Sequence, residues 1–139
     1  MIVLDTDILS LFFTGHPRVA ERMRREQEQI VATVVSRIEI LTGRFASVIK
    51  AVDGKQLLQA QEWLRVSEQE DLSRIVFLPF DSLAATEFDR LRNNKKLKKI
   101  GRGDLLIAAI ALARRATLVS RNVRDFRQVP GLRVENWAA

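Results

Sequence analysis

The sequence predicts an α/β fold, with a parallel central sheet of four to five strands and helices on both of its faces. Three observations lead to this prediction. Short apolar runs rich in β-branched residues recur along the chain, amphipathic or apolar helical segments separate them, and polar residues follow the runs abruptly. Continuous apolar runs are typical of parallel strands buried on both faces, and parallel strands need a crossover segment between them. The length fits a single domain spanning residues 1–139.

The first predicted strand is the apolar run Ile2–Leu4, which Asp5, Thr6 and Asp7 follow directly. In open α/β sheets, ligands bind just beyond the carboxyl ends of the strands, which is where Asp5 stands. The alternative interpretation is structural, since Asp is a preferred N-cap and either aspartate could cap the next helix.

The next segments are two helices over residues 8–13 and 18–29, which Gly15-His16-Pro17 separates. His16 is interpreted as a loop residue without a role. Residues 30–34 are the second predicted strand. Ser36 follows as a candidate N-cap with Glu39 three residues later, the spacing of a capping box. Alternatively, Glu39 points back from the first turn of its helix toward Asp5.

A helical hairpin is predicted in the middle of the chain. The helix that starts near Ser36 continues to about Val52, Asp53-Gly54 forms a turn, and an amphipathic helix covers residues 55–72. The apolar faces of these helices exceed what one face of a sheet needs. Such an excess often marks a dimer or partner interface, and an internal core is the other possibility.

The second half of the chain repeats the alternation of strand and helix. Residues 75–78 form the third strand, Asp81 or Ser82 caps a helix over residues 83–91, and a densely basic segment follows over residues 93–102. Such a charge run is usually a solvated loop. This one leads directly into Gly103 and Asp104.

Asp104 begins a helix that is apolar almost all round, which indicates burial on most sides, and Asp104 can serve as its cap. Residues 117–120 are the fourth strand, which a polar cluster with Asn122 and Asp125 follows. Residues 132–135 form a fifth, edge strand.

Composition excludes several kinds of site. The chain has no cysteine and one histidine, which rules out disulfides and thiolate metal sites and leaves little for a histidine-rich site. A metal would be held by carboxylates, which favours Mg²⁺ or Mn²⁺. No apolar segment is long enough for a bilayer, so a cytoplasmic protein without membrane contact is expected. The net charge of +6 fits a polyanionic partner.

The polar residues at the strand-to-helix junctions are expected to meet at one edge of the sheet. Several carboxylates there repel one another by several kcal/mol each at intermediate dielectric, and a divalent cation relieves this. Such an ion deprotonates water and stabilises charge on a phosphodiester. The basic segment would bind backbone phosphates beside it. The acidic or amide groups are Asp5, Glu39, Asp104 and either Asn122 or Asp125, and the cations are Lys95, Lys96, Lys98, Lys99 and Arg102.

Five stretches resemble PIN domains and occur in the order of that family. They are residues 2–7 (Ile-Val-Leu-Asp-Thr-Asp), 36–43 (Ser-Arg-Ile-Glu-Ile-Leu-Thr-Gly), 103–109 (Gly-Asp-Leu-Leu-Ile-Ala-Ala), 119–126 (Val-Ser-Arg-Asn-Val-Arg-Asp-Phe) and 134–137 (Val-Glu-Asn-Trp). The resemblance covers essentially the whole chain and is greatest to the VapC-type toxins of bacterial VapBC toxin–antitoxin modules.

The resemblance implies a PIN-like three-layer sandwich and a magnesium- or manganese-dependent endoribonuclease. It also implies a toxin that is often a homodimer, is inhibited by a cognate VapB-type antitoxin and contacts DNA only through that antitoxin. Asp5, Glu39 and Asp104 match the core acidic positions of the family, and Asn122 or Asp125 fills the fourth. The supporting positions are Thr6, Asp7, Ser36 and Ser120, with Asp7 standing where Asn is commoner.

Two other interpretations are weighed against this one. Asp5-Thr6-Asp7 also resembles the paired aspartates of haloacid-dehalogenase-type phosphatases, although that motif needs Thr or Val at the position of Leu9 and a later acidic pair. The second interpretation is a catalytically silent basic module that binds nucleic acid or a protein partner. The three matched acids argue against it, because carboxylates repel phosphate unless a metal intervenes.

Overall fold

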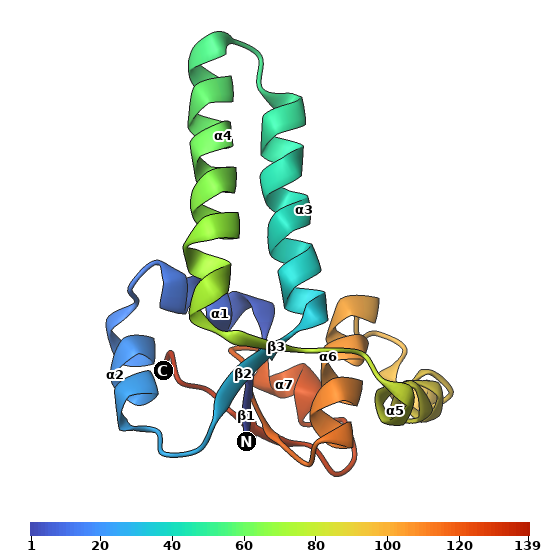
Figure 1. Cartoon of the computed structure of the whole chain (residues 1–139). Helices are drawn as coiled ribbons and strands as arrows, with labels where there is room; N and C mark the ends of the chain where they lie inside the picture. Colours follow the sequence, from blue (N-terminus) through green and yellow to red (C-terminus); the bar gives the residue numbers. More distant parts are fainter.

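The centre of the molecule is a five-stranded sheet in which every pair of neighbouring strands is parallel, in the order β3-β2-β1-β4-β5. The computed structural model describes residues 1–139 (Figure 1). Strand β1 lies in the middle, where Val3 pairs with Val31 on one side and with Leu118 on the other. The strands are β1 (Ile2–Leu4), β2 (Ile30–Thr33), β3 (Val76–Leu78), β4 (Thr117–Val119) and β5 (Arg133–Glu135).

Helices cover both faces of this sheet, as predicted. Alternate side chains of a strand point to opposite faces. Val3 accordingly packs into a cluster with residues of α5, α6 and α7, whereas Ile2 and Leu4 pack with α1, α2 and Trp137. The helices are α1 (Thr6–Phe13), α2 (Pro17–Arg25), α3 (Val34–Lys50), α4 (Gly54–Gln69), α5 (Ser82–Arg92), α6 (Arg102–Ala113) and α7 (Val123–Phe126), with 3₁₀ turns at Asp71–Arg74 and Lys95–Leu97.

Helix α6 is the most buried helix, which explains its apolar sequence. Its residues from Ile107 to Ala111 are all buried, and α5 packs along it. Because a helix that is apolar all round must be covered on most sides, α6 has little freedom to shift. It therefore holds the residues of its first turn, including Asp104, in a fixed place relative to the sheet.

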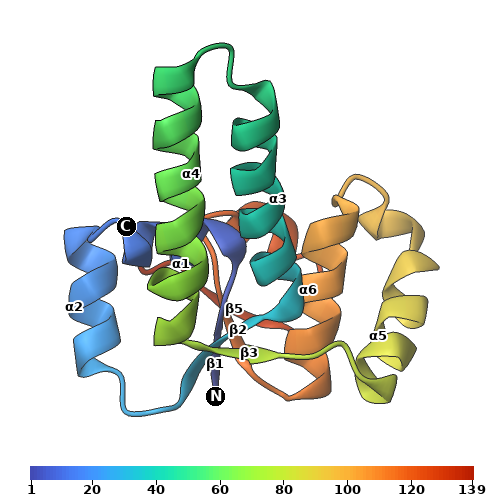
Figure 2. The same cartoon turned by 45° about the horizontal axis from the view of Figure 1, so that its top comes forward.

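Helices α3 and α4 form a hairpin that extends well beyond the sheet (Figures 1 and 2). The two helices pack against each other along their length. Several large apolar side chains nevertheless remain exposed on the hairpin, including Ile49 (82%) on α3, Val52 (81%) in the connection and Leu58 (71%) on α4. The excess of apolar surface expected from the sequence is therefore present, and it lies outside the core.

Some local boundaries differ from the predictions. Strand β2 ends at Thr33, and the Thr33 hydroxyl caps α3 by accepting from the Ser36 backbone N–H, so the predicted Ser36–Glu39 capping box is wrong. Gly101, not Asp104, is the N-cap of α6. Asp81 caps α5 through the Ala84 N–H.

The helix predicted over residues 18–29 ends at Arg25, and the one predicted over residues 55–72 ends at Gln69 and is followed by a 3₁₀ turn. The end of α2 is highly charged and has no apolar stripe that would extend it over the sheet.

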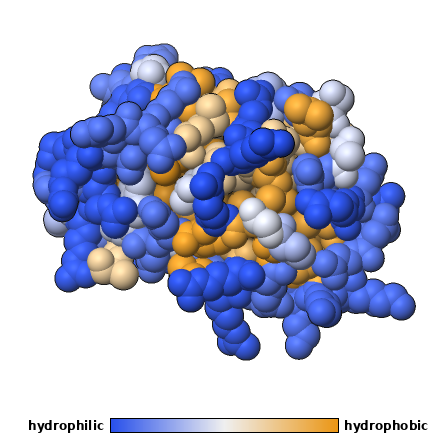
Figure 3. Space-filling model, turned by 90° about the horizontal axis from the view of Figure 1, so that it is seen from below, coloured by the Kyte–Doolittle hydropathy of each residue, from blue (hydrophilic) through white to orange (hydrophobic).

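The surface of the molecule is mostly polar where the strands begin. Figure 3 shows this end, with hydrophilic side chains around a smaller apolar area. None of the helices combines the length and the apolarity that crossing a bilayer requires.

Candidate active site

A cavity of about 390 Å³ opens at the carboxyl end of the central strands, and only polar or charged residues and no hydrophobic ones line it. Four of its lining residues are acidic and one is basic, so the cavity is strongly negative when all of them are ionised. Three of the acids are those predicted for the core acidic positions, and the fourth, Asp7, is one of the predicted supporting positions. The lining residues are Asp5, Thr6, Asp7, Glu39, Asp104, Arg121 and Asn122.

Asp5 has two roles in this cavity, because it both lines the cavity and caps α1. Its side chain is 6% exposed, and its Oδ1 accepts from the Ile8 N–H at 2.9 Å. The pKa of Asp5 is raised to about 6, chiefly by burial; hydrogen bonds from Ser120 and Ile8 oppose the rise, and the nearby charges of Asp7 and Asp104 add to it. The capping and the functional interpretations of Asp5 are therefore compatible.

Glu39 reaches the cavity from the second turn of α3 and is held there by side chains rather than by a capping box. The Thr6 hydroxyl donates to Glu39 Oε1 at 2.6 Å and lies 2.9 Å from the Ser36 hydroxyl. On its other side, Glu39 packs against the start of α6, where a Cβ atom on Gly103 would lie 3.2 Å from Oε2. Thr6 and Ser36 thus position Glu39, and Gly103 leaves it room.

Asp104 lies in the first turn of α6 and is partly buried. No helix-capping hydrogen bond occupies its carboxylate, in contrast to Asp5. Burial raises the pKa of Asp104, and the negative charges of Glu39 and Asp125 add to this shift. Asp104 is therefore a carboxylate in an environment that disfavours its charge, with its oxygens free for a ligand.

Asn122 and Asp125, the two candidates for the fourth position, act together. The Asn122 side chain lines the cavity and donates from Nδ2 to Asp125 Oδ2 at 2.9 Å. The backbone N–H of Asn122 donates to the buried Ser120 hydroxyl at 2.9 Å, which anchors the loop after β4. Asp125 itself does not line the cavity, but its charge acts on Asp104.

The cations of the predicted phosphate-binding segment do not line the cavity: the four lysines lie between α5 and α6, and Arg102 is the first residue of α6. Buried Leu97 and Ile100 hold this segment against the core, and its cations are exposed to solvent. The Arg102 guanidinium lies 5.5 Å from the centre of the Phe88 ring. The exposed cations are Lys95, Lys96, Lys98, Lys99 and Arg102.

Arg121 is the cavity residue that the sequence analysis missed. Its Nε donates to Asp7 Oδ2 at 2.5 Å and its Nη2 to Asp7 Oδ1 at 3.2 Å. The available signal was its position one residue after the fourth strand, within the same polar cluster that drew attention to Asn122.

The donor set suits a hard divalent cation. Carboxylate, amide and hydroxyl oxygens are the ligands of Mg²⁺ and Mn²⁺, and Mg²⁺ is commonly bound through one or two carboxylates together with several waters. No three acidic side chains of the structure converge as the ligands of one ion. Two direct carboxylates, Asp5 and Asp104, with Glu39 reached through water, would supply the protein ligands of such an ion.

Comparisons with known proteins agree on one family. Residues 2–132 match the model of the PIN domain. The chain is 34% identical to the tRNA(fMet)-specific endonuclease VapC of Salmonella typhimurium over 97% of this chain and 96% of that protein. It is 40% identical to Ribonuclease VapC2 of Rickettsia felis over 68 residues, a stretch that spans about half the length of each protein (48% and 51%).

A solved structure gives the same result. The crystal structure of VapBC2 from Rickettsia felis bound to a DNA fragment from their promoter contains a chain that superposes with a TM-score of 0.77 at 29% identity, covering 99% of both chains.

The burial of Asp5 predicts a pH-dependent cost to folding. Because the pKa of Asp5 is about 6 in the folded state and 3.8 ordinarily, its contribution to stability is present below pH 3.8 and is lost as the pH rises through 6. Asp5→Asn keeps an oxygen for the Ile8 N–H and removes the charge. We expect it to raise the free energy of unfolding by about 2–3 kcal/mol at pH 8 and by little at pH 4.

Urea unfolding with EDTA at both pH values measures this difference. Asp53→Asn is the matched control, because Asp53 caps α4 by the same contact at an exposed position. An equal effect of Asp5→Asn on the free energy of unfolding at pH 4 and pH 8 would contradict a raised pKa of Asp5.

Proposed function

The chain belongs to the PIN domain family and to its VapC ribonucleases, and we propose that it is a divalent-metal-dependent endoribonuclease that acts as the toxin of a type II toxin–antitoxin module. The observation that carries the proposal is the cavity with four carboxylates at the carboxyl ends of the central strands. Burial and mutual repulsion raise the pKa of two of them, Asp5 and Asp104. A site of this kind is stabilised by a bound cation.

Each residue has a distinct role in the proposed reaction. Asp5 and Asp104 would hold the Mg²⁺ or Mn²⁺ ion, which when bound would lower the pKa of a water molecule and stabilise negative charge on the phosphodiester. Glu39 is exposed and is oriented by Thr6, so it can accept a proton from the attacking water or bind the ion through a water. Asn122, supported by Asp125 and Ser120, presents an amide that can orient the water or the scissile phosphate.

The proposed substrate is RNA. The exposed lysines before α6 and Arg102, its first residue, place positive charge at the start of the helix that carries Asp104. Figure 2 shows that this connection between α5 and α6 lies at the end of α6 that faces α3. Cations in this place attract the phosphates that flank the cleaved bond. A phosphate backbone could thus contact the basic segment while one of its bonds reaches the acidic cavity.

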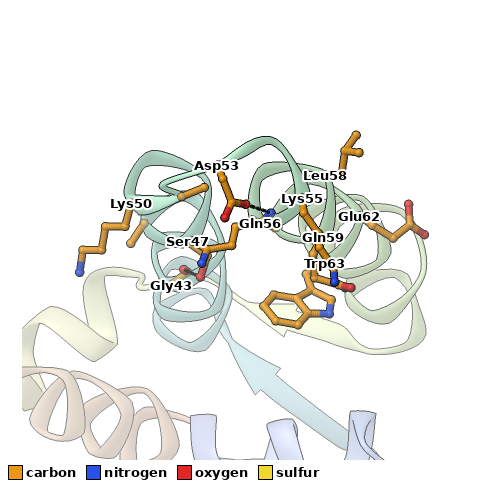
Figure 4. A pocket seen from close by; sticks show the side chains of 13 residues that line it. Gly43, Ser47, Lys50, Asp53, Lys55, Gln56, Leu58, Gln59, Glu62 and Trp63 are labelled. Carbon is orange, nitrogen blue, oxygen red and sulfur yellow. Dashed lines mark hydrogen bonds between the residues drawn. The ribbon is translucent and has the colours of Figure 1, made fainter.

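The proposed protein partner is a VapB-type antitoxin, through which alone the chain would contact DNA. The solved complex of VapBC2 with promoter DNA supports this proposal. The hairpin of α3 and α4 offers a surface for it, because its tip carries exposed apolar residues and a cavity of about 1180 Å³. Figure 4 shows the Trp63 indole reaching from α4 toward α3 beside this cavity. A second copy of the chain is also a proposed partner, as a homodimer.

The central test is cleavage of RNA by the purified chain. We expect single-stranded and structured RNA, with tRNA(fMet) among the substrates, to be cut with Mg²⁺ or Mn²⁺ and to stay intact with EDTA. Asp5→Asn and Asp104→Asn should each lower kcat at least a hundredfold, because each removes a proposed ligand of the ion. Release of phosphate from small esters with intact RNA would instead support a phosphatase, and equal RNA binding without any cleavage would support a silent binding module.

A second prediction concerns the space beside Glu39. Gly103→Ala places a methyl group 3.2 Å from Glu39 Oε2 and so displaces the carboxylate. In a helix, alanine is favoured over glycine by about 0.5–1 kcal/mol, so the free energy of unfolding should be unchanged or higher. We expect kcat to fall about tenfold without loss of stability. Gly43→Ala is the control in α3, since a Cβ there meets nothing within 4 Å.

A third prediction concerns the hairpin. Ile49→Glu and Leu58→Glu place charges at side chains that are 82% and 71% exposed, so the fold should tolerate them. We expect both variants to cleave RNA at the unmodified rate and to escape inhibition by the cognate antitoxin. Leu83→Glu on α5, where the side chain is 63% exposed, is the control and should remain inhibited. Light scattering of the same variants alone reports whether the hairpin also mediates self-association.

A further inference from the structure

Arg121 is the one cation that lines the acidic cavity. It stands between the end of β4 and the start of α7, directly after the buried Ser120. Its side chain is 54% exposed, so its guanidinium is accessible to a ligand that enters the cavity from solvent. None of the roles described above for the acids of the cavity accounts for a cation in this position.

The contact between Arg121 and Asp7 leaves part of the guanidinium unused. Nε and Nη2 donate to the two oxygens of the Asp7 carboxylate. A guanidinium has five N–H donors in a rigid plane, and the structure gives Nη1 no hydrogen-bond partner. Two parallel donors on the outer edge of the plane therefore remain, one on Nη1 and one on Nη2. This is the arrangement in which arginine binds two oxygens of a phosphate.

The same contact indicates what Asp7 does. Asp7 lies in the first turn of α1, and its side chain is 49% exposed. An ion pair this exposed contributes little to stability, so its main effect is to orient the Arg121 side chain. Both carboxylate oxygens of Asp7 accept hydrogen bonds from Arg121, which distinguishes Asp7 from Asp104 with its free oxygens.

We propose that Arg121 binds a backbone phosphate of the RNA at the edge of the acidic cavity, and that Asp7 is the positioning residue that aims its guanidinium. This inference rests on the proposed ribonuclease function and adds a phosphate subsite to it. The arrangement explains how a polyanion approaches a cavity lined by four carboxylates: one fixed cation holds a phosphate beside the group of acids. Asp7 is accordingly not a ligand of the metal ion.

Steady-state cleavage of a short RNA tests the subsite. We expect Arg121→Ala to raise KM about tenfold with kcat changed less than threefold, because a charged hydrogen-bonding contact to substrate is lost. The KM of Arg121→Lys should lie between that of the unmodified chain and that of Arg121→Ala, since lysine keeps the charge but lacks the two parallel N–H donors. Arg24→Ala is the matched control: Arg24 is 68% exposed and pairs with Glu21 at 2.6 Å on α2, outside the cavity. It should leave KM unchanged.

The positioning role of Asp7 needs a variant that keeps the charge. Asp7→Glu moves the carboxylate by one methylene group, so we expect it to raise KM about threefold in the presence of Arg121 and to have no effect in the Arg121→Ala background. The Mg²⁺ concentration for half-maximal rate should stay the same. A rise in that concentration on Asp7→Glu would identify Asp7 as a metal ligand and overturn its assignment.

RNA binding without cleavage gives a second readout. In the Asp104→Asn background with EDTA, fluorescence anisotropy of labelled RNA against KCl concentration measures how many phosphates are neutralised. Arg121→Ala should reduce the slope of log K against log[KCl] by about 0.7, the contribution of one contact to a single strand, and urea unfolding should not change.

The outcomes separate the two proposals. An unchanged KM and salt slope in Arg121→Ala would overturn the phosphate subsite while the ribonuclease assignment stands. Cleavage that survives Asp104→Asn would overturn the ribonuclease mechanism itself.

Discussion

The crowding of carboxylates around the buried Asp5 is the constraint on which this structure depends. The sheet order places β1 between β2 and β4, so the side chains that follow these strands must meet at one edge. Asp5 is almost fully buried there, and the charges of Asp7 and Asp104 act on it. A fold that only needed a cap for α1 could use serine or asparagine at this position without such repulsion. The crowding of these carboxylates therefore supports the proposal that a cation binds among them.

The packing of the site shows how the fold keeps these groups in place despite their repulsion. Asp5 is fixed by the helix that it caps, Glu39 by the Thr6 hydroxyl and Asp125 by the Asn122 amide. Asp104 is fixed through its backbone, since α6 is anchored by its buried residues from Ile107 to Ala111. These supports come from α1, from α6 and from the residue that precedes α7. A ligand that binds in the cavity thus meets an arrangement that is largely formed in advance, which lowers the cost of organising it.

The sequence predicted the sheet and the acidic residues because both follow from strong patterns. Buried parallel strands must be continuously apolar, and the polar residues that end them are conspicuous. The N-cap of α3 was harder to predict, because Thr and Ser are both favoured N-cap residues. The residue at which β2 ends decides between Thr33 and Ser36. Helix α7 has four residues, too few for a periodic pattern. The role of Arg121 was not predicted, because its partner Asp7 is 114 positions away in the sequence. A single exposed arginine also produces no hydrophobic periodicity or motif that would mark it.

The distribution of charge reconciles an acidic cavity with a basic protein. The net charge of +6 attracts a polyanion over distances comparable to the Debye length, about 8–10 Å at physiological salt. Within that distance the carboxylates of the cavity would repel the same polyanion. The exposed lysines precede the helix that carries Asp104, and the guanidinium of Arg121 lines the cavity itself, so both place positive charge close to these carboxylates. Attraction at long range therefore depends on the surface as a whole, whereas binding of RNA at the proposed site would depend on a few fixed cations and on the proposed metal ion.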